Sequence, residues 1–548
     1  MNTPTIQHAG PPMGTWFPSE DNYKEDHTLA EAMRSIARPL YLVSENGSLV
    51  ARSRGSITIG DALPAERNFP LMGYASPVRL EHLGDVDFCR DCGIRYPYIG
   101  GSMARGISST AMVEALGRAG MLGFFGSAGL SLDAVEAAID RLSQTPDSFP
   151  FGINLIHSPG QPDLEAALVD LYLRKGIHLV EASAFMALTL PVIRYRVTGI
   201  HRGPDGSIIT PNRIIAKVSR EEIATKFFSP PPEKLLRELV SNQEITPEQA
   251  ELAGRIPVAQ DVTAEADSGG HTDRRPALTL FPTICSVRDR MQKQFNYSVP
   301  LRVGLGGGIG TPISAASAFT MGAAYIMTGS INQACTESGT SDQVRDMLAA
   351  TRQADVTMAP AADMFEMGVT VQVLKRGTMF AMRAAKLFKL YRAHTSIDDL
   401  PPTDRQQLET TLFKAPLEDI WEQTRSFFLQ RDPRQVERAE RDEKHRLALV
   451  FRWYLGQSPR WASIGESSRR VDYQIWCGPA MGAFNEWVKG TFLETPANRQ
   501  IVPVAFNILL GASVILRLNQ LRRQGVNVGS PAPWVMPIES NAIKEYLT

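Results

Sequence analysis

Two glycine-rich turns, one helix apart, have the composition and spacing of an anion-binding site. Residues 302–306 and 323–328 each have the apolar character of a short buried strand, and a turn follows each. Such turns leave backbone N–H groups open to an anion, with no side chain in the way. Two successive units of this kind match the phosphate site after strands seven and eight of a TIM barrel. We therefore expect a phosphorylated cofactor there, bound by Gly306, Gly307 and Gly308 of the first turn and Gly329 and Ser330 of the second.

A dinucleotide-binding fingerprint is the main alternative for the first turn, and its spacing does not fit. Counted from Gly304 and Gly306, the third glycine would fall at Ile309. Counted from Gly306 and Gly308, it would fall at Thr311. A glycine-rich turn without a ligand is a further alternative for either turn alone. Two such turns in succession favour a shared anion.

A third segment places an ionisable side chain beside another glycine pair. Gly269 and Gly270 precede His271, and strand-like residues at 256–259 and 261–263 come before them, so this loop should also lie at the barrel mouth. A glycine pair permits close approach of the backbone to a flat ligand. Histidine has an ordinary pKa near neutrality, which makes His271 the candidate for acid–base chemistry. A hydrogen-bonded structural histidine is the alternative.

Composition excludes several function classes. The 548 residues carry a formal net charge of -1, which gives no electrostatic reason to expect nucleic acid as a partner. The five cysteines fit a reducing compartment, and Cys89 and Cys92 lack further ligands to complete a metal site, so we expect no metal. Residues 1–20 lack the layout of a signal peptide. The apolar stretch 502–516 is too short to span a bilayer, so we expect a buried helix there and a cytoplasmic protein.

The order of predicted elements indicates an α/β protein built on a TIM (β/α)8 barrel. Residues 1–82 hold an N-terminal extension and short strands that predict a small β-containing cap. Residues 83–380 alternate apolar strands with amphipathic helices, which predicts the barrel, with a helical insertion at about 221–254. Residues 381–548 are mainly helical and predict a C-terminal domain packed on the barrel. We expect this domain and the insertion to form walls around the mouth.

Several of these segments resemble the nitronate monooxygenase-like flavoproteins, which include FMN-dependent enoyl-acyl carrier protein reductases. The likeness rests on Gly269–His271, Ser102–Ala104, Pro150–Asn154, the strand-end Lys217 and both phosphate turns. From about Leu83 to Trp487 the chain is more closely similar to one branch, the PfaD-type trans-acting enoyl reductases of polyunsaturated fatty acid synthases and trans-acyltransferase polyketide synthases. Segments that match this branch include Glu181–Phe185, Asp355–Met367 and Tyr473–Trp476.

The resemblance implies that the phosphorylated cofactor is FMN and that NADPH donates the hydride. The flavin ring or ribityl chain would contact Lys217 and Asn154, and the ring would be flanked by Met103, Ala104, Gly269 and Gly270. Core packing is the alternative for Met103, and hydrogen bonding to a turn backbone is the alternative for Asn154. A lysine that ends an apolar barrel strand needs an anionic or acceptor partner, so Lys217 is harder to explain without a ligand.

The implied reaction is reduction of an α,β-unsaturated thioester carried on an acyl carrier protein. His271 would polarise the thioester carbonyl or manage the proton at the α-carbon. The implied partners are the acyl carrier protein, a synthase megacomplex and a second copy of the chain in a homodimer. Two other functions remain open, a nitronate monooxygenase with His271 as general base and a non-catalytic docking subunit.

Overall fold

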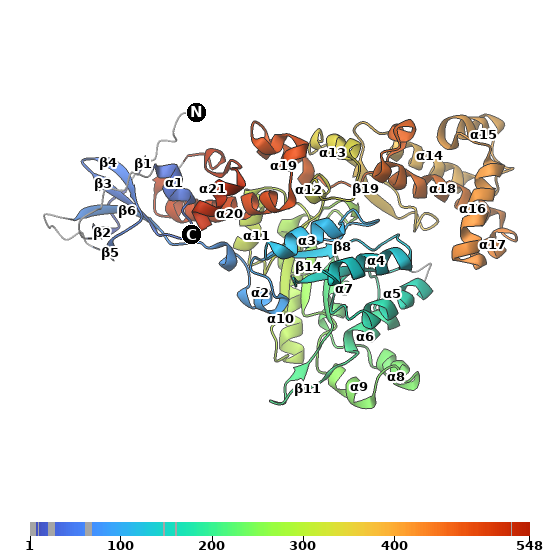
Figure 1. The fold of residues 1–548 in the computed structure, drawn as a ribbon, viewed down its shortest axis with the longest axis horizontal. Coiled ribbons are helices and arrows are strands. Elements are labelled where there is room, and N and C mark those ends of the chain that lie inside the picture. The colour runs from blue at the N-terminus through green and yellow to red at the C-terminus, as the bar shows by residue number, and fades with distance from the viewer. Residues whose placement is uncertain are drawn as a thin grey trace.

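The computed structural model describes residues 7–8, 10–19, 28–60, 68–145, 148–158, 162–527 and 529–547. Within residues 1–20, where the sequence predicts no signal peptide, residues 1–6, 9 and 20 lie outside these described residues. Figure 1 shows an N-terminal sheet at the left, a barrel that extends downward from the centre, and a lobe of residues 356–476 at the right. We call this last part the helical lobe.

Eight parallel strands close into a barrel, which confirms the predicted fold class. Each strand pairs with the next along the chain, and the last pairs with the first. The strands are buried on both faces, which explains their continuous apolar runs. In chain order they are β7 (Tyr98–Gly100), β8 (Leu122–Phe125), β9 (Phe151–Ile156), β10 (Leu179–Ser183), β13 (Arg213–Val218), β14 (Asp261–Glu265), β16 (Arg302–Gly306) and β17 (Ile326–Thr328).

Helices cover the outside of the barrel, and several of them begin at hydroxyl caps. Ser109, Ser131 and Thr311 each accept a hydrogen bond from a backbone N–H in the first turn of the helix that follows. Since a helix follows each strand, the carboxyl ends of all eight strands meet at one mouth. The covering helices are α3 (Thr110–Arg118), α4 (Leu132–Ser143), α5 (Pro162–Arg174), α6 (Leu190–Val197), α7 (Glu221–Phe228), α10 (Ala277–Phe295) and α11 (Pro312–Thr320).

The strand predicted at 256–259 is wrong, because these residues form a buried connection into β14. The backbone N–H groups of Val258 and Ala259 donate to the carbonyls of Ser229 (3.0 Å) and Phe227 (2.8 Å). These donors are therefore used at the end of α7 and cannot join a strand ladder.

The helices added to the barrel lie at the end opposite the mouth. Helix α7, which falls inside the predicted insertion, packs against β13 and α10 as a regular barrel helix. The added helices are α8 (Glu233–Ser241) and α9 (Pro247–Ala253), which pack on α6 and lie at the bottom of Figure 1. They connect a helix to the next strand, and such connections lie at the amino ends of barrel strands.

The N-terminal cap is a five-stranded antiparallel sheet in the order β4-β3-β6-β2-β5. Trp16 is buried on it and donates its indole N–H to the carbonyl of Arg54 (3.0 Å). The strands are β2 (Gly14–Phe17), β3 (Leu40–Glu45), β4 (Ser48–Arg52), β5 (Ser56–Ile59) and β6 (Phe69–Ala75), and α1 (Leu29–Arg34) packs beside them.

The helices after residue 380 contribute to two different cores. Those of the helical lobe share a core with β18 (Val356–Pro360) and β19 (Thr370–Leu374). They are α14 (Phe380–Ala393), α16 (Leu417–Arg431), α17 (Pro433–Ala439) and α18 (Glu443–Ile464), while the short α15 (Pro402–Gln407) has no buried residue. By contrast, α19 (Ala480–Val488) and α20 (Ile501–Arg523) join the core of the barrel and the cap.

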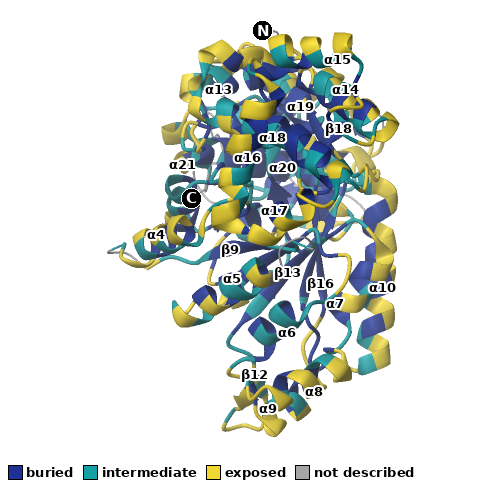
Figure 2. Cartoon of the chain, turned by 90° about the vertical axis from the view of Figure 1, so that its right-hand side faces the viewer, coloured by how far each residue is buried: buried dark blue, intermediate teal, exposed yellow. Residues whose placement is uncertain are grey.

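Helix α20 is long and apolar enough to cross a membrane by composition, but 78% of its most apolar window is buried within the protein. It packs along α11, and the buried guanidinium of Arg517 donates to backbone carbonyls of the cap, including those of Met33 and Ser35. Figure 2 shows this helix as predominantly buried. The predicted buried helix is therefore confirmed.

Candidate active site

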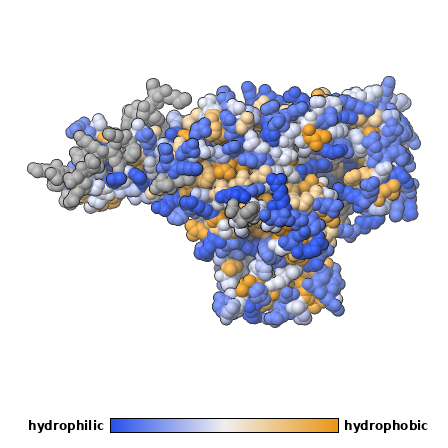
Figure 3. All heavy atoms as spheres, viewed as in Figure 1, coloured by the Kyte–Doolittle hydropathy of each residue, from blue (hydrophilic) through white to orange (hydrophobic). Residues whose placement is uncertain are grey.

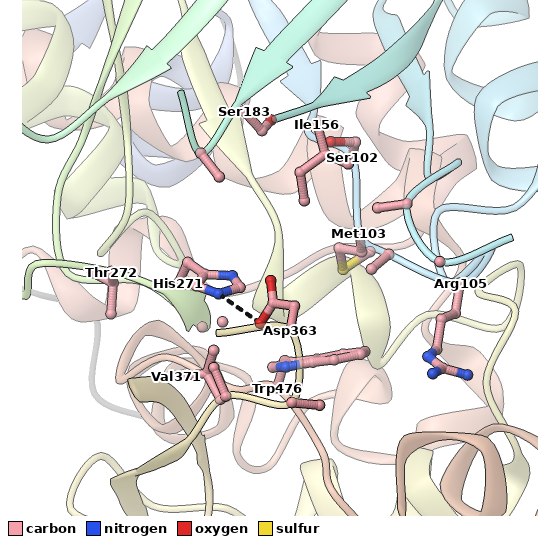
Figure 4. A pocket seen from close by; sticks show the side chains of 18 of the residues that line it. Ser102, Met103, Arg105, Ile156, Ser183, His271, Thr272, Asp363, Val371 and Trp476 are labelled. Atoms are coloured by element: carbon pink, nitrogen blue, oxygen red, sulfur yellow. Dashed lines mark ion pairs between the residues drawn. The ribbon is translucent and has the colours of Figure 1, made fainter. Parts of the chain in front are cut away.

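A cavity of about 1200 Å³ lies between the carboxyl ends of the barrel strands and the helical lobe. The space-filling view in Figure 3 shows mixed apolar and polar surface where the barrel meets the rest of the chain. All twelve residues singled out in the sequence line this one cavity, namely Met103, Ala104, Asn154, Lys217, Gly269, Gly270, His271, Gly306, Gly307, Gly308, Gly329 and Ser330. Figure 4 shows His271 and Met103 on different sides of it. The structure thus brings these residues together, and their individual roles stay predictions.

The two phosphate turns follow β16 and β17, the seventh and eighth strands of the barrel. Gly307 and Gly308 have φ of 79° and 74°, a backbone region that favours glycine. A Cβ added at Gly308 or at Gly329 would meet nothing within 4 Å, so bare backbone borders the cavity at both turns. This arrangement fits a phosphate group. The Ser330 hydroxyl also accepts a hydrogen bond from the Gly478 backbone N–H (2.9 Å).

Lys217 lies in the barrel mouth between two carboxylates. Its Nζ is 3.5 Å from Oε2 of Glu181 and 3.7 Å from Oε1 of Glu265. Burial favours the neutral amine, but the two carboxylates outweigh burial and raise the pKa of Lys217 to about 12. Lys217 is therefore protonated and held in place at neutral pH.

Glu181 is fully buried at the base of the site. Its Oε2 accepts hydrogen bonds from the backbone N–H (3.2 Å) and the hydroxyl of Ser102. Its Oε1 has no hydrogen-bond partner in the described part of the chain. Burial raises the pKa of Glu181, and Lys217 opposes this effect. Glu181 does not itself line the cavity, so its carboxylate acts on the site through Lys217 and Ser102, which do.

Asn154 has a structural role in addition to its place in the cavity lining. Its Nδ2 donates to the carbonyl of Glu181 (3.1 Å) and to the hydroxyl of Ser183 (2.9 Å). These hydrogen bonds connect β9 to β10. They agree with the alternative interpretation, in which the Asn154 side chain hydrogen-bonds to the backbone. Its side-chain oxygen remains the atom that a ribityl or ring group could contact.

The loop that carries Met103 and Ala104 is held by hydrogen bonds and close packing. The hydroxyl of Ser108 accepts from the Met103 N–H (2.9 Å) and donates to the carbonyl of Gly101 (2.8 Å). At Gly126 an added Cβ would lie 1.7 Å from the Met103 carbonyl oxygen, so only glycine allows the two loops to meet. The loop is a rigid part of the cavity wall.

His271 is held by the helical lobe and not by a barrel strand. It ends β15 (Gly270–His271), which pairs antiparallel with β19 so that His271 lies opposite Val371. Its Nε2 is 3.4 Å from Oδ1 of Asp363 (Figure 4). That is an ion-pair distance, but the contact does not meet hydrogen-bond geometry, and Nε2 is buried without a hydrogen-bond partner.

The neighbouring charges favour the protonated form of His271. Burial and, more weakly, the positive charge of Lys217 lower the pKa of His271. The carboxylate of Asp363 and, more weakly, that of Glu265 raise it. The carboxylates have the larger effect, so the pKa lies above its ordinary value. The same pairing lowers the pKa of Asp363 against the effect of burial. The structure gives Nδ1 of His271 no acceptor among the described residues, so this nitrogen is available to a ligand.

Gly269 has a structural reason to be glycine. An added Cβ would lie 2.8 Å from the backbone nitrogen of Cys477, in the segment that returns from the helical lobe to the barrel. In the same segment Trp476 lines the cavity, and its side chain lies 3.8 Å from an added Cβ at Gly270. The glycine pair therefore allows this segment to close over the mouth, in addition to any contact with a flat ligand.

One expectation about the surroundings of the site is wrong. The inserted helices α8 and α9 contribute no residue to the cavity lining, so the insertion is not a wall of the mouth. Cys89 and Cys92 are buried in α2 (Val86–Cys92), away from the cavity, and burial raises the pKa of each to about 12. Among the described residues no three metal-ligating side chains are grouped around a common point.

Sequence reasoning missed Glu181, Asp363 and Trp476 as site residues. A glutamate inside the apolar strand 179–183 carries the same signal as Lys217 and could have been found in the same way. Asp363 and Trp476 are far from the barrel in sequence and have no comparable local signal. Only the packing of the helical lobe places them at the cavity.

Two family models match parts of the chain. Residues 90–187 match the model described as nitronate monooxygenase. Residues 394–473 match the model described as [acyl-carrier-protein] S-malonyltransferase, inserted helical domain. The first match covers the first half of the barrel, and the second covers most of the helical lobe.

Several known proteins are similar over most of the chain. The crystal structure of the enoyl reductase domain of MlnA, from the macrolactin biosynthesis cluster of Bacillus amyloliquefaciens, is 40% identical, with a TM-score of 0.77 over 81% of this chain and 100% of that chain. A polyunsaturated fatty acid synthase protein of Thraustochytrium sp. is 48% identical over 88% of this chain. Polyketide biosynthesis protein PksE of Bacillus subtilis is 45% identical over 80% of this chain. The chain spans only 32% and 57% of the lengths of these two curated relatives.

Proposed function

The chain belongs to the family of enoyl reductases of polyketide and polyunsaturated fatty acid synthases, within the nitronate monooxygenase-like superfamily, and from this we propose that it is an FMN- and NADPH-dependent enoyl reductase. Its substrate would be an enoyl thioester carried on an acyl carrier protein of a synthase complex. The observation that carries the proposal is the single cavity in which bare glycine turns, a charged lysine and a histidine with a raised pKa converge. Homodimerisation and a cytoplasmic location stay predictions.

The cavity has the groups that FMN would need. The backbone of Gly306 to Gly308, with Gly329 and Ser330, would hold the phosphate, as at other barrel phosphate sites. Lys217 and the side-chain oxygen of Asn154 would contact the ring or ribityl chain. When bound and reduced by NADPH, FMN would supply the hydride that the β-carbon of the substrate receives.

The residues of this chain would then act on the substrate carbonyl and the proton. His271, whose protonated form Asp363 favours, can donate a hydrogen bond from Nδ1 to the thioester oxygen, where negative charge develops. A proton from His271 or from water would reach the α-carbon. The substrate thus gains one hydride and one proton, and NADPH becomes NADP⁺. The helical lobe covers the mouth and limits the access of bulk water to this step.

A nitronate monooxygenase is the second candidate, because residues 90–187 match that model. That reaction would use His271 as a general base, which requires a neutral imidazole. The ion pair with Asp363 opposes the neutral form, so it favours the enoyl reductase.

Cofactor analysis and a direct comparison of substrates test the proposal. Mass spectrometry of the released cofactor should identify FMN. The enzyme should oxidise NADPH in the presence of crotonyl-pantetheine and turn over propionate-3-nitronate poorly or not at all. Bound FAD would contradict the cofactor assignment, and preferred nitronate turnover would replace the reaction. A protein without flavin would support the docking subunit.

A further inference from the structure

Three arginines from separate segments line the outer part of the cavity. Arg105 lies in the loop after β7, Arg431 ends α16 and Arg460 lies in α18. We call these three residues the arginine cluster. Figure 4 places Arg105 across the cavity from His271. Arg105 has a φ of 59°, and its Nη2 donates to the carbonyl of Gly456 in α18 (3.1 Å), so the barrel loop is attached to the helical lobe at this point.

The cluster lacks the carboxylates that accompany the other cavity arginines. Arg220 is 2.9 Å from Asp273, and Arg452 is 3.7 Å from Glu366. Among the described residues, no carboxylate lies within 4 Å of any of the three cluster side chains. The guanidinium carbon of Arg431 instead lies 5.7 Å from the centre of the Phe427 ring. Nη1 of Arg460 donates a hydrogen bond to the side-chain oxygen of Gln457 (3.5 Å).

Like charges oppose one another within the cluster. Burial, and then the positive charges of Arg431 and Arg460, lower the pKa of Arg105. Three uncompensated cations around one cavity wall, in a chain whose net charge is only -1, form a local site of positive potential. A bound anion would remove this repulsion and use the free guanidinium donors.

We propose that the arginine cluster binds a phosphate ester that enters the cavity with the reactants. Guanidinium groups match phosphate oxygens in a bidentate geometry and stay charged at all physiological pH values. The proposal rests on the proposed function, which supplies two sources of the same chemistry, the phosphodiester of the carrier protein's phosphopantetheine arm and the phosphates of NADPH. The site is separate from the glycine turns assigned to the FMN phosphate, because it is formed by side chains of the helical lobe and the β7 loop.

The test compares substrates that differ only in the phosphate. The variant is the double substitution Arg431→Ala with Arg460→Ala, whose residues are both exposed, so the fold should be retained. Arg470→Ala is the matched control, since Arg470 is exposed on the same lobe but does not line the cavity. Crotonyl-phosphopantetheine and crotonyl-pantetheine are assayed with saturating NADPH, and KM for NADPH is measured with crotonyl-pantetheine.

Each outcome either identifies the phosphate that the arginine cluster binds or contradicts the proposal. We expect kcat/KM for crotonyl-phosphopantetheine to fall about tenfold or more in the double variant, with crotonyl-pantetheine unchanged, and the loss to shrink as salt is raised. A rise in KM for NADPH alone would assign the site to the nucleotide phosphates. Unchanged values for all reactants would overturn the proposal. If the wild type reduces neither thioester, the proposed function fails, and calorimetric binding of phosphopantetheine and NADPH to wild type and variant then decides the cluster by itself.

Discussion

The barrel mouth and the arginine cluster both present cations to the same cavity, but only those of the barrel mouth are neutralised by the protein. Lys217 has two carboxylates within 4 Å, whereas the cluster arginines have none among the described residues. A neutralised cation holds its position whether or not a ligand is present, because its charge already has partners. An uncompensated cluster is most stable when an anion arrives. The comparison supports our proposals that the barrel binds a resident cofactor and that the lobe binds a reactant transiently.

The largest effect should come from breaking the neutralised site. Lys217→Met leaves the fully buried Glu181 and the half-buried Glu265 without their shared cation, and removing one partner of a buried ion pair typically costs about 3–5 kcal/mol. We expect this loss in urea unfolding, together with loss of bound flavin. Lys175→Met is the matched control, because Lys175 also lies between two carboxylates, each 2.8 Å away, but at the surface. Equal destabilisation by the two variants would show that burial is not the decisive factor.

A large effect confined to the reaction is expected for His271→Ala. A positioned acid or donor is worth about a hundredfold to ten-thousandfold. Flavin content and the rate of flavin reduction by NADPH should be retained, while the half-reaction with enoyl thioester slows. Stopped-flow measurement of each half-reaction separates the two. Equal rates of substrate reduction in variant and wild type would leave His271 a structural residue and assign the proton to solvent.

A smaller effect should follow when charge is added at a phosphate turn. Gly307→Asp should lower FMN occupancy, but its Cβ would lie 2.5 Å from the Ala266 carbonyl oxygen, so strain and charge would act together. Gly329→Asp avoids this problem, because Gly329 has open space around an added Cβ. We expect reduced flavin content in Gly329→Asp and near-normal content in the neutral control Gly329→Asn, measured from the ratio of flavin to protein absorbance. Equal content in both would place the phosphate elsewhere.

The smallest effect should be a displaced pH profile in Asp363→Asn. The Asp363 carboxylate raises the pKa of His271, so its removal lowers that pKa, while Glu265 and Lys217 continue to act on the ring. His271 then loses its proton at a lower pH, so the alkaline limb of the kcat profile should move to lower pH. The value of kcat at acidic pH should change little. Asp363→Glu should restore part of the wild-type profile. An unchanged alkaline limb would mean that His271 does not carry the proton.

The barrel and the identity of the residues at its mouth could be predicted from the chain because their signals are local. Gly307 and Gly308 do adopt positive φ, and β16 and β17 do lead into the two turns. The error at 256–259 arose because apolar residues can be buried without joining a ladder. The wrong expectation that the insertion forms a wall of the mouth could have been avoided. The inserted helices α8 and α9 follow a helix and precede a strand, and such connections lie away from the mouth.

The sequence by itself determined which side chains the barrel presents, because a strand end and the turn after it are set by neighbouring residues. Only the tertiary structure decided what faces them. Asp363 and Trp476 reach the cavity because the helical lobe folds back onto the mouth through β15 and β19. Arg105 meets α18 for the same reason. These contacts join segments that are about ninety or more residues apart on the chain, so no local pattern of residue types encodes them. The packing of the helical lobe, which has its own hydrophobic core, positions them.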